Sequence, residues 1–414
     1  MMPPRYRHPG TRLQILVASV FMILYTLDAA ATNLKMDVIP SVRLEEGWNS
    51  NVFNAADNEV SSFGTRLTPG LALKFTTSDG VVFQISGSYE KVWYYEPEAK
   101  EANTDTYYFR LNSSGELRFT PKLSMVPSVY YINTTNSFRR NQLLPTDDPV
   151  VPSVSYINYG ATKTEDFGAG VAFNYMAAPK LRIELKGHYG EQRFVNDTSG
   201  SGGGDSTTAG GGVSVSYLYT PRTSFGPGVS GSHQTYENNP NSDILSAGIL
   251  LDHQFSPELR VNGAVGMSRV RVDSALGIPE QEYSNPAGYV RLSYTSGTFT
   301  ANIFGSAGYG ELSGFGKPTY QWTAGLWISD QFAKAWSWDL SGNYQVSRED
   351  VGADLGDVRT TYGTAGLRYQ PWAWAGLDLT GNINRQTTSG QLWNPVDTYS
   401  VILGFTIGKP YNIF

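Results

Sequence analysis

Hydrophobic and polar residues alternate along residues 63–95, and much of the remaining chain repeats this pattern. Phe63 and Phe75 share one parity with several leucines, while Arg66 and Lys74 fall on the other parity. Because neighbouring side chains of a strand point to opposite faces, the pattern predicts two long strands with one apolar face each, joined by the Ser-Asp-Gly turn at residues 78–80. A tilted strand of this length can cross the roughly 30 Å hydrocarbon layer of a membrane.

The same alternation predicts eighteen strands after Lys35. Their connections alternate between long polar segments and short turns that follow an aromatic residue, as in Phe119-Thr-Pro-Lys, Tyr219-Thr-Pro-Arg and Phe255-Ser-Pro-Glu. Proline ends a strand ladder, and an amphipathic ring suits a membrane interface. The pattern therefore predicts an all-β fold, a transmembrane antiparallel up-and-down β-barrel with tight turns at one rim and long loops at the other.

The one continuous apolar run lies near the N-terminus, at residues 13–27, where three arginines precede it and three alanines follow it. This order predicts a secretory signal peptide over residues 1–31 and a β-barrel over residues 32–414. An even strand count places both ends of the barrel at the same rim. In a bacterial outer membrane, the rim with short turns is the periplasmic one, so both termini are expected there.

The composition supports a barrel and excludes several classes of protein. Only 16% of the 414 residues are charged, whereas soluble domains carry about 25%. The formal net charge is −6 and the basic residues are scattered, which argues against a nucleic-acid partner. The chain has no cysteine, so disulfides, thiol catalysis and cysteine-ligated metals are excluded.

The sequence predicts no enzymatic centre. Beyond the predicted signal peptide, the histidines are His188, His233 and His253, and none forms a closely spaced pair suited to a metal. The chain has no GxSxG nucleophile motif and no phosphate-binding GxxxxGK motif. His188 shares the parity of several charged residues, and a polar lumen lining explains it. We therefore expect no catalytic residue, no metal ligand and no cofactor.

The polar parity predicts the lining of a water-filled lumen, since eighteen strands enclose more space than side chains can fill. The candidate lining residues are Arg66, Glu90, Tyr94, Tyr108, Arg110, Glu116, Arg118, Arg182, Glu184, Lys186, Arg291 and Arg368. Both signs of charge occur, which argues against strong ion selectivity. Hydroxyl groups and amides suit polyols, and the rings of Tyr94, Tyr108 and Tyr130 on the same parity suit the faces of sugars. The alternative is that these residues only solvate the lumen and brace the wall.

The longest predicted loop, residues 136–158, is the candidate for a constriction of the lumen. Its charged residues are Arg139, Arg140, Asp147 and Asp148. The loop can fold inward or remain outside the barrel, and the sequence favours neither. Acidic loops at residues 96–105 and 349–357 could bridge divalent cations to lipopolysaccharide phosphates, although solvated polar loops are the default interpretation.

The end of the chain leaves one question of register open. Phe414 is the terminal aromatic residue expected of a chain that the barrel-assembly machinery recognises, yet it lies out of parity with Phe405 and Ile407. Either the last strand ends near Ile407 and a short tail follows, or a bulge restores the register.

Residues 40–73 resemble the opening of the outer-membrane family called β-barrel porin type 2. The matching segments are Asn51-Val52-Phe53, Asp57-Asn58-Glu59-Val60-Ser61 and Arg66-Leu67-Thr68-Pro69-Gly70. Members of this family occur with exopolysaccharide biosynthesis and export systems. The resemblance therefore implies an accessory role in exopolysaccharide export, with the glycan and periplasmic export components as partners.

Three functions remain open from the sequence. The first is an outer-membrane conduit or accessory protein for exopolysaccharide export. The second is a general diffusion porin for small polar solutes. The third is a structural or adhesive barrel that acts through its extracellular loops. Each would sit among outer-membrane lipid and lipopolysaccharide.

Overall fold

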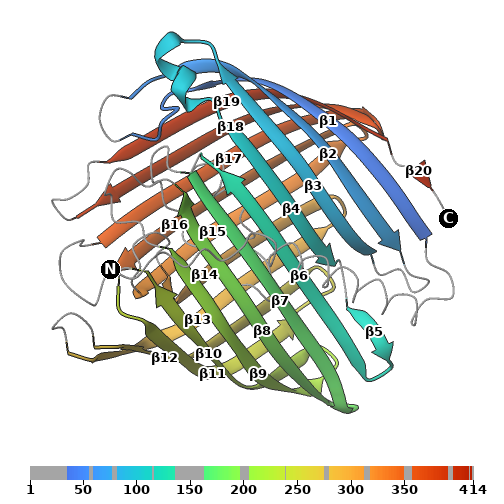
Figure 1. The fold of residues 1–414 in the computed structure, drawn as a ribbon. Helices are drawn as coiled ribbons and strands as arrows, with labels where there is room; N and C mark the ends of the chain where they lie inside the picture. Colours follow the sequence, from blue (N-terminus) through green and yellow to red (C-terminus); the bar gives the residue numbers. More distant parts are fainter. Residues whose placement is uncertain are drawn as a thin grey trace.

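A computed structural model describes residues 35–55, 59–76, 82–113, 116–135, 163–195, 205–237, 239–274, 279–311, 318–348, 357–389, 395–409 and 411–412. Strands make up almost all of these ranges (Figure 1). The predicted signal peptide, residues 1–31, lies outside them. So does the predicted constriction loop at residues 136–158.

The strands of the first half are β1 (Lys35–Asn49), β2 (Ser62–Thr76), β3 (Val82–Tyr94), β4 (Asp105–Ser113), β5 (Leu117–Thr120), β6 (Leu123–Thr134), β7 (Lys163–Ala178), β8 (Leu181–Val195), β9 (Ser206–Thr220) and β10 (Thr223–Tyr236). Those of the second half are β11 (Ser242–Gln254), β12 (Leu259–Val272), β13 (Gln281–Ser296), β14 (Phe299–Glu311), β15 (Pro318–Ala333), β16 (Trp336–Arg348), β17 (Asp357–Trp372), β18 (Ala375–Thr388), β19 (Val396–Gly408) and β20 (Tyr411–Asn412). One short 3₁₀ helix, η1 (Pro97–Ala102), also lies in the described ranges.

The prediction of eighteen strands is confirmed for the part of the chain that the structure describes. β4 and β5 both pair with β6, so they form two halves of one interrupted strand. β20 has only two residues and continues the line of β19. The remaining strands are mostly 13 to 16 residues long, longer than the roughly 5–6 residues of ordinary globular strands.

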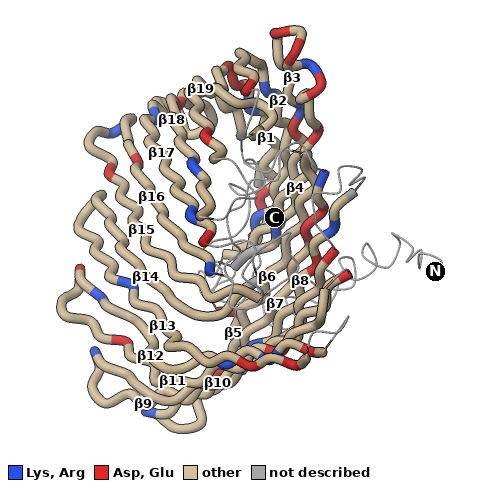
Figure 2. The backbone as a smooth tube through the Cα atoms, turned by 90° about the vertical axis from the view of Figure 1, so that its left-hand side faces the viewer, with Lys and Arg blue, Asp and Glu red and all other residues tan. Residues whose placement is uncertain are grey.

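The sheet closes on itself. Successive strands pair antiparallel, except that β4 and β5 share β6 as their partner and that β20 pairs with β1. β1 also pairs with β19, from Ser41 opposite Gly408 to Asn49 opposite Ser400. Figure 2, turned by a right angle from Figure 1, shows the resulting ring of strands with charged residues of both signs distributed around it. Closure leaves no long unpaired edge, which is how a sheet can stand in hydrocarbon.

The register of β20 answers the question about the end of the chain. Tyr411 lies opposite Val38 and Gly408 lies opposite Ser41, so the pairing continues without an inserted residue. Tyr411 is exposed, like Phe405 and other apolar residues of β19. No bulge therefore interrupts the described part of this strand, and Phe414 lies outside the described residues.

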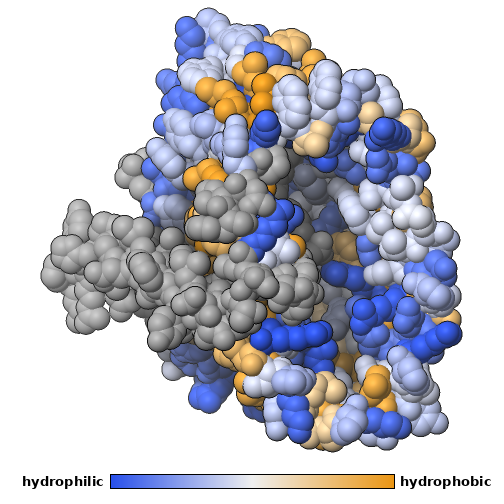
Figure 3. Space-filling model, turned by 90° about the vertical axis from the view of Figure 1, so that its right-hand side faces the viewer, coloured by the Kyte–Doolittle hydropathy of each residue, from blue (hydrophilic) through white to orange (hydrophobic). Residues whose placement is uncertain are grey.

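The alternation of the sequence becomes an apolar outer face and a polar inner face. On β11, Leu245, Ile249 and Leu251 are each about half exposed on the outward parity, while Ser242 on the inward parity is buried. In the space-filling view the surface is hollowed between the walls, and hydrophilic side chains gather around the hollow (Figure 3). None of the helices in the described ranges is long and apolar enough to cross a membrane.

The two rims differ as predicted. One rim has short turns, such as residues 179–180, 221–222 and 297–298, and it also holds the first described residue of β1 and the last of β20. Exposed aromatic residues gather next to these turns; they include Tyr219, Phe255, Phe332, Trp372 and Trp374. The rings of Trp372 and Trp374 stack with centroids 5.6 Å apart. A band of this kind suits a membrane interface.

Candidate functional site

Five charged side chains on the inward parity form a chain of ion pairs, which we call the seam ladder. From β18 to β3 it contains Asp378, Arg43, Glu45, Arg66 and Glu90. The Arg43 Nη2 atom lies 2.6 Å from Asp378 Oδ2 and 2.9 Å from Glu45 Oε1. The Arg66 Nη1 atom lies 3.3 Å from Glu45 Oε2, and its Nε atom lies 3.6 Å from Glu90 Oε1.

Burial explains why the ladder alternates in sign. Glu45 is 5% exposed and Glu90 is 3% exposed, and a buried carboxylate is costly unless a cation accompanies it. The ladder crosses the closing pair of strands, β1 and β19, where Gly404 leaves room for Arg43 to reach Asp378. These charges therefore brace the wall at the closure of the barrel instead of standing free in the lumen.

Further pairs of inward side chains join β8 to β7 and to Glu116, the residue just before β5. The Arg182 Nη2 atom lies 2.6 Å from Glu116 Oε1 and 2.6 Å from Asn174 Oδ1. The Lys186 Nζ atom lies 2.9 Å from Glu184 Oε1. Among the described residues, the predicted lining therefore consists largely of opposite charges in contact, which favours a lumen with mild ion preference.

The other charged candidates on the inward parity are four arginines, most of whose cross-strand partners are polar. Arg110 is opposite Ser86 and Tyr130, and Arg118 is opposite Ser124. Arg291 is opposite Asn262 and Phe304, and Arg368 is opposite Asp378 and Ser337. Arg110 and Arg118 lie on the two halves of the interrupted strand formed by β4 and β5, whereas Arg291 lies on β13 and Arg368 on β17, so the structure does not bring all four into one cluster. Their role as lining residues stays a prediction.

The tyrosines that suggested sugar stacking offer little open ring surface. Tyr94 is 7% exposed and Tyr130 is 6% exposed, while Tyr108 lies opposite Ser88 and is half-buried. A ring that stacks on a passing sugar must present its face to the lumen. Tyr94 and Tyr130 therefore act as packing residues in the described part of the wall.

Tyr94 is buried by a cap that the sequence reasoning missed. Val52, Ala99 and Ala102 pack against Val92 and Tyr94, so the loop after β1 and the helix η1 cover the inward parity of β3 at the rim with long loops. Sequence reasoning treated residues 96–105 as a solvated acidic loop. The signal was present in the two alanines, which share one face of a 3₁₀ turn because they are three residues apart.

Asparagine side chains fix the loop after β1. Asn51 is fully buried; its Nδ2 donates to the Ala55 carbonyl at 2.7 Å, and its Oδ1 accepts from the Ala55 amide at 2.9 Å. Asn54 adopts the left-handed conformation with φ of 50°, which asparagine tolerates well. The Thr398 hydroxyl donates to Asn54 Oδ1 at 3.1 Å. The cap is thus tied to the start of β19.

Ser62 and Glu96 hold η1 on the other side. Glu96 is the residue just before η1, and its carboxylate accepts a hydrogen bond from the Ser62 hydroxyl. This hydrogen bond favours the ionised carboxylate and holds the pKa of Glu96 below its usual range.

The histidines do not form a catalytic group. His188 lies on the inward parity, and its Nε2 atom has no hydrogen-bond partner among the described residues. His233 contacts Asp243 at 2.8 Å, and His253 contacts Thr223 at 2.8 Å, both on the outward parity. The wall therefore separates His188 from the other two. No group of three potential metal ligands occurs in the described ranges.

Comparisons with known proteins give a likeness of fold only. No protein-family model and no curated protein matches the chain, so the resemblance to the exopolysaccharide-associated family is not confirmed. Solved structures with a similar fold include the outer membrane protein OpdK from Pseudomonas aeruginosa, at 12% identity and a TM-score of 0.44, covering 92% of this chain and all of that one. OpdO from the same organism has 12% identity and a TM-score of 0.45, covering 92% and 98%. OccAB3 from Acinetobacter baumannii has 9% identity and a TM-score of 0.44, covering 91% and 100%. Likeness at this level is limited to the general barrel architecture.

Proposed function

We propose that this protein is an outer-membrane porin that lets small polar solutes diffuse through its lumen. The observation that carries the proposal is the division of the closed sheet into an apolar outward parity and an inward parity of polar and paired charged residues. Lipid can solvate the first face and water the second. The short-turn rim with its aromatic band would then face the periplasm, with both ends of the barrel beside it.

The side chains that line the lumen fit a porin for small solutes better than they fit a conduit for exopolysaccharide. A long glycan favours a continuous track of open aromatic faces and hydrogen-bonding groups along its path. In the described wall, Tyr94 and Tyr130 are buried, and most of the described charges are engaged with each other. Mutually paired charges suit the passage of small solutes through water.

An outer-membrane location implies contacts with the membrane and with the machinery that inserts barrels into it. We expect the exposed apolar side chains to contact outer-membrane lipid and lipopolysaccharide, and we expect the barrel-assembly machinery to insert the chain. No cofactor enters this function.

Conductance across a planar lipid bilayer tests the proposal. The purified protein, added to one side, should give stable steps of ohmic conductance in potassium chloride, with little preference between cation and anion. Addition of long glycans should leave these steps unchanged. Steps that long glycans block, but small solutes do not, would support the export reading instead. The lack of any conductance would leave only the structural or adhesive reading.

A further inference from the structure

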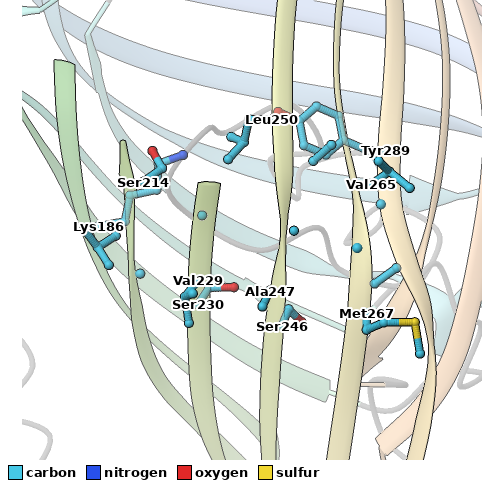
Figure 4. Close-up of a pocket in the computed structure, with 18 of the residues that line it drawn as sticks. Lys186, Ser214, Val229, Ser230, Ser246, Ala247, Leu250, Val265, Met267 and Tyr289 are labelled. Atoms are coloured by element: carbon cyan, nitrogen blue, oxygen red, sulfur yellow. The ribbon is translucent and has the colours of Figure 1, made fainter. Parts of the chain in front are cut away.

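A pocket lies on the inner wall where β8 to β13 lie side by side (Figure 4). Its volume is about 300 Å³, at the lower end of the range for small-molecule sites. The pairing of the strands places the inward-parity residues of the pocket in three parallel rows. Ser214, Gly228, Gly248, Gly266 and Ala287 form the middle row, in that order across the strands.

Glycine creates the depth of this pocket. A Cβ atom at Gly248 would lie 2.6 Å from the Val265 carbonyl oxygen, and one at Gly266 would lie 2.0 Å from the Ala247 carbonyl oxygen. The neighbouring strands are therefore too close at Gly248 and Gly266 for a side chain at either position. The middle of this row, at Gly228, Gly248 and Gly266, is thus a glycine floor of bare backbone between two rows that carry larger side chains.

The two flanking rows differ in chemistry. On one side of the floor lie Ser230 and Ser246, opposite each other on β10 and β11. On the other side lie Leu250, Ala264 and Tyr289, from β11, β12 and β13. Figure 4 shows Leu250 and the ring of Tyr289 side by side along one edge, with the two serines along the opposite edge. One edge can thus contact an apolar group and the other can hydrogen-bond.

A pair of opposite charges closes the end of the pocket on β8. Lys186 and Glu184 both line the pocket, and the Lys186 Nζ atom lies 2.9 Å from Glu184 Oε1. Their side chains remain about a third and a quarter exposed, so a solute can reach them.

We propose that this pocket binds a free α-amino acid with a flat apolar side chain. The carboxylate of such a zwitterion can replace Glu184 as the partner of Lys186, while its ammonium group becomes the partner of Glu184. The side chain then lies over the glycine floor against Leu250 and Tyr289. The proposal deepens the proposed porin function, because it names a class of solute that the lumen would retain.

Binding in detergent tests this inference without any need for conduction. The full-length protein in micelles should give saturation-transfer NMR signals and a saturable isotherm with L-phenylalanine. Phenylacetate lacks the ammonium group, phenethylamine lacks the carboxylate and glycine lacks the ring. Each should bind at least about tenfold more weakly, since each gives up one of the contacts. Equal binding of phenylacetate and L-phenylalanine, or no binding of L-phenylalanine at millimolar concentration, would overturn the proposal.

Variants locate the site. Ala264→Phe adds a ring to a side chain that already points over the floor, so it should abolish binding of L-phenylalanine without strain on the backbone. Glu184→Gln should weaken L-phenylalanine about tenfold without weakening phenylacetate, because the ammonium contact is lost while Lys186 stays charged and loses its competing partner. Asp339→Asn, on the inward parity of β16, is the matched control and should bind as the parent does. Binding that survives Ala264→Phe would place the amino acid elsewhere and refute the assignment.

Failure of this inference is distinguishable from failure of the porin proposal. A protein that conducts ions but binds no amino acid is a porin without this site. A protein that binds L-phenylalanine in micelles but gives no conductance has the site without an open pore. The two measurements use the same preparation.

Discussion

Arg43 on the first strand and Asp378 on the last strand but one are joined by an ion pair of 2.6 Å, although 335 residues separate them in the chain. The pair passes over Gly404 on β19, which lies between the two strands. It therefore links the two ends of the sheet across the pair of strands that closes the barrel. Because Arg43 is also bound to Glu45, the link continues through Arg66 to Glu90 on β3.

Loss of Asp378 should weaken the closed barrel. In Asp378→Asn, Arg43 keeps Glu45 but loses its shortest contact, and we expect a loss of about 1–3 kcal/mol in the free energy of unfolding. Urea unfolding in detergent, followed by tryptophan fluorescence, measures this loss. Arg269→Met is the control, because the pair between Arg269 and Glu282 lies exposed on the outward parity. The control should lose no more than about 1 kcal/mol. Equal losses in both variants would contradict the role of the seam ladder.

Gly404 should matter for the same reason. A Cβ atom at this position would lie 2.9 Å from both carboxylate oxygens of Asp378 and 3.0 Å from Arg43 Nη2, so Gly404→Ala should push the ion pair apart. We expect a loss similar to that of Asp378→Asn. The double variant should be little worse than either single one, since both remove the same contact. Gly381→Ala is the control, because nothing lies within 4 Å of its added atom. Additive losses in the double variant would show that Gly404 acts in another way.

The stability of η1 at the rim should depend on pH, because Glu96 titrates. Its pKa is lowered in the folded protein by the Ser62 hydroxyl, so the contact contributes fully at pH above the ordinary glutamate pKa of about 4.3 and is lost as the pH falls through the lower folded value. Hydrogen exchange of residues 96–104, corrected for intrinsic rates, should therefore show protection that falls in acid. Ser62→Ala should show weaker protection at pH 7 and a smaller fall. Identical profiles would mean that this hydrogen bond does not hold η1.

The predicted constriction loop at residues 136–158 lies outside the described residues, so conductance must test it. Its removal should raise the single-channel conductance if the loop occupies the lumen, since a wider path carries more ions. Removal of residues 390–394, between β18 and β19, is a control on the same rim. Unchanged conductance in the first variant would leave the loop outside the barrel.

The fold could be predicted from the sequence because the two faces of the sheet need different side chains, apolar ones outward and polar ones inward. The outward residues in the middle of a segment such as β11 must be apolar, whatever their neighbours are, and Leu245, Ile249 and Leu251 therefore mark the strand without any knowledge of its partners. The lengths of the connections then order the strands, because short turns can only join neighbours. Even the continuation of the last strand into Tyr411 obeys this parity.

The candidate site was harder to predict from the sequence than the fold, because it depends on which residues lie opposite each other on neighbouring strands. Parity placed Arg43 and Asp378 on the inner face separately, but only the register brings them together. The glycine floor is a second case. Gly228, Gly248 and Gly266 are 20 and 18 residues apart in sequence and carry no hydropathy signal, and only the pairing of β10, β11 and β12 aligns them. The cap of η1 on Tyr94 is likewise a contact between segments that periodicity does not relate.

Ion preference offers the most direct test of whether the inward parity faces water that ions cross. Arg110 and Arg118 lie opposite serines on β3 and β6, away from the seam ladder. Replacing both with glutamate changes the local charge from positive to negative, which should attract cations and repel anions within roughly 10 Å at 0.1 M salt. The reversal potential in a gradient of potassium chloride should therefore shift toward that of potassium. The shift should shrink in 1 M salt, where charges are screened within about 3 Å.

Arg269→Glu with Arg271→Glu is the control, because it makes the same change of charge on the outward parity. There Arg269 contacts Glu282 and Arg271 contacts Glu280. The reversal potential of this control variant should equal that of the parent. If the outward pair shifts the potential as much as the inward pair does, the polar parity is not the lining of the conducting path.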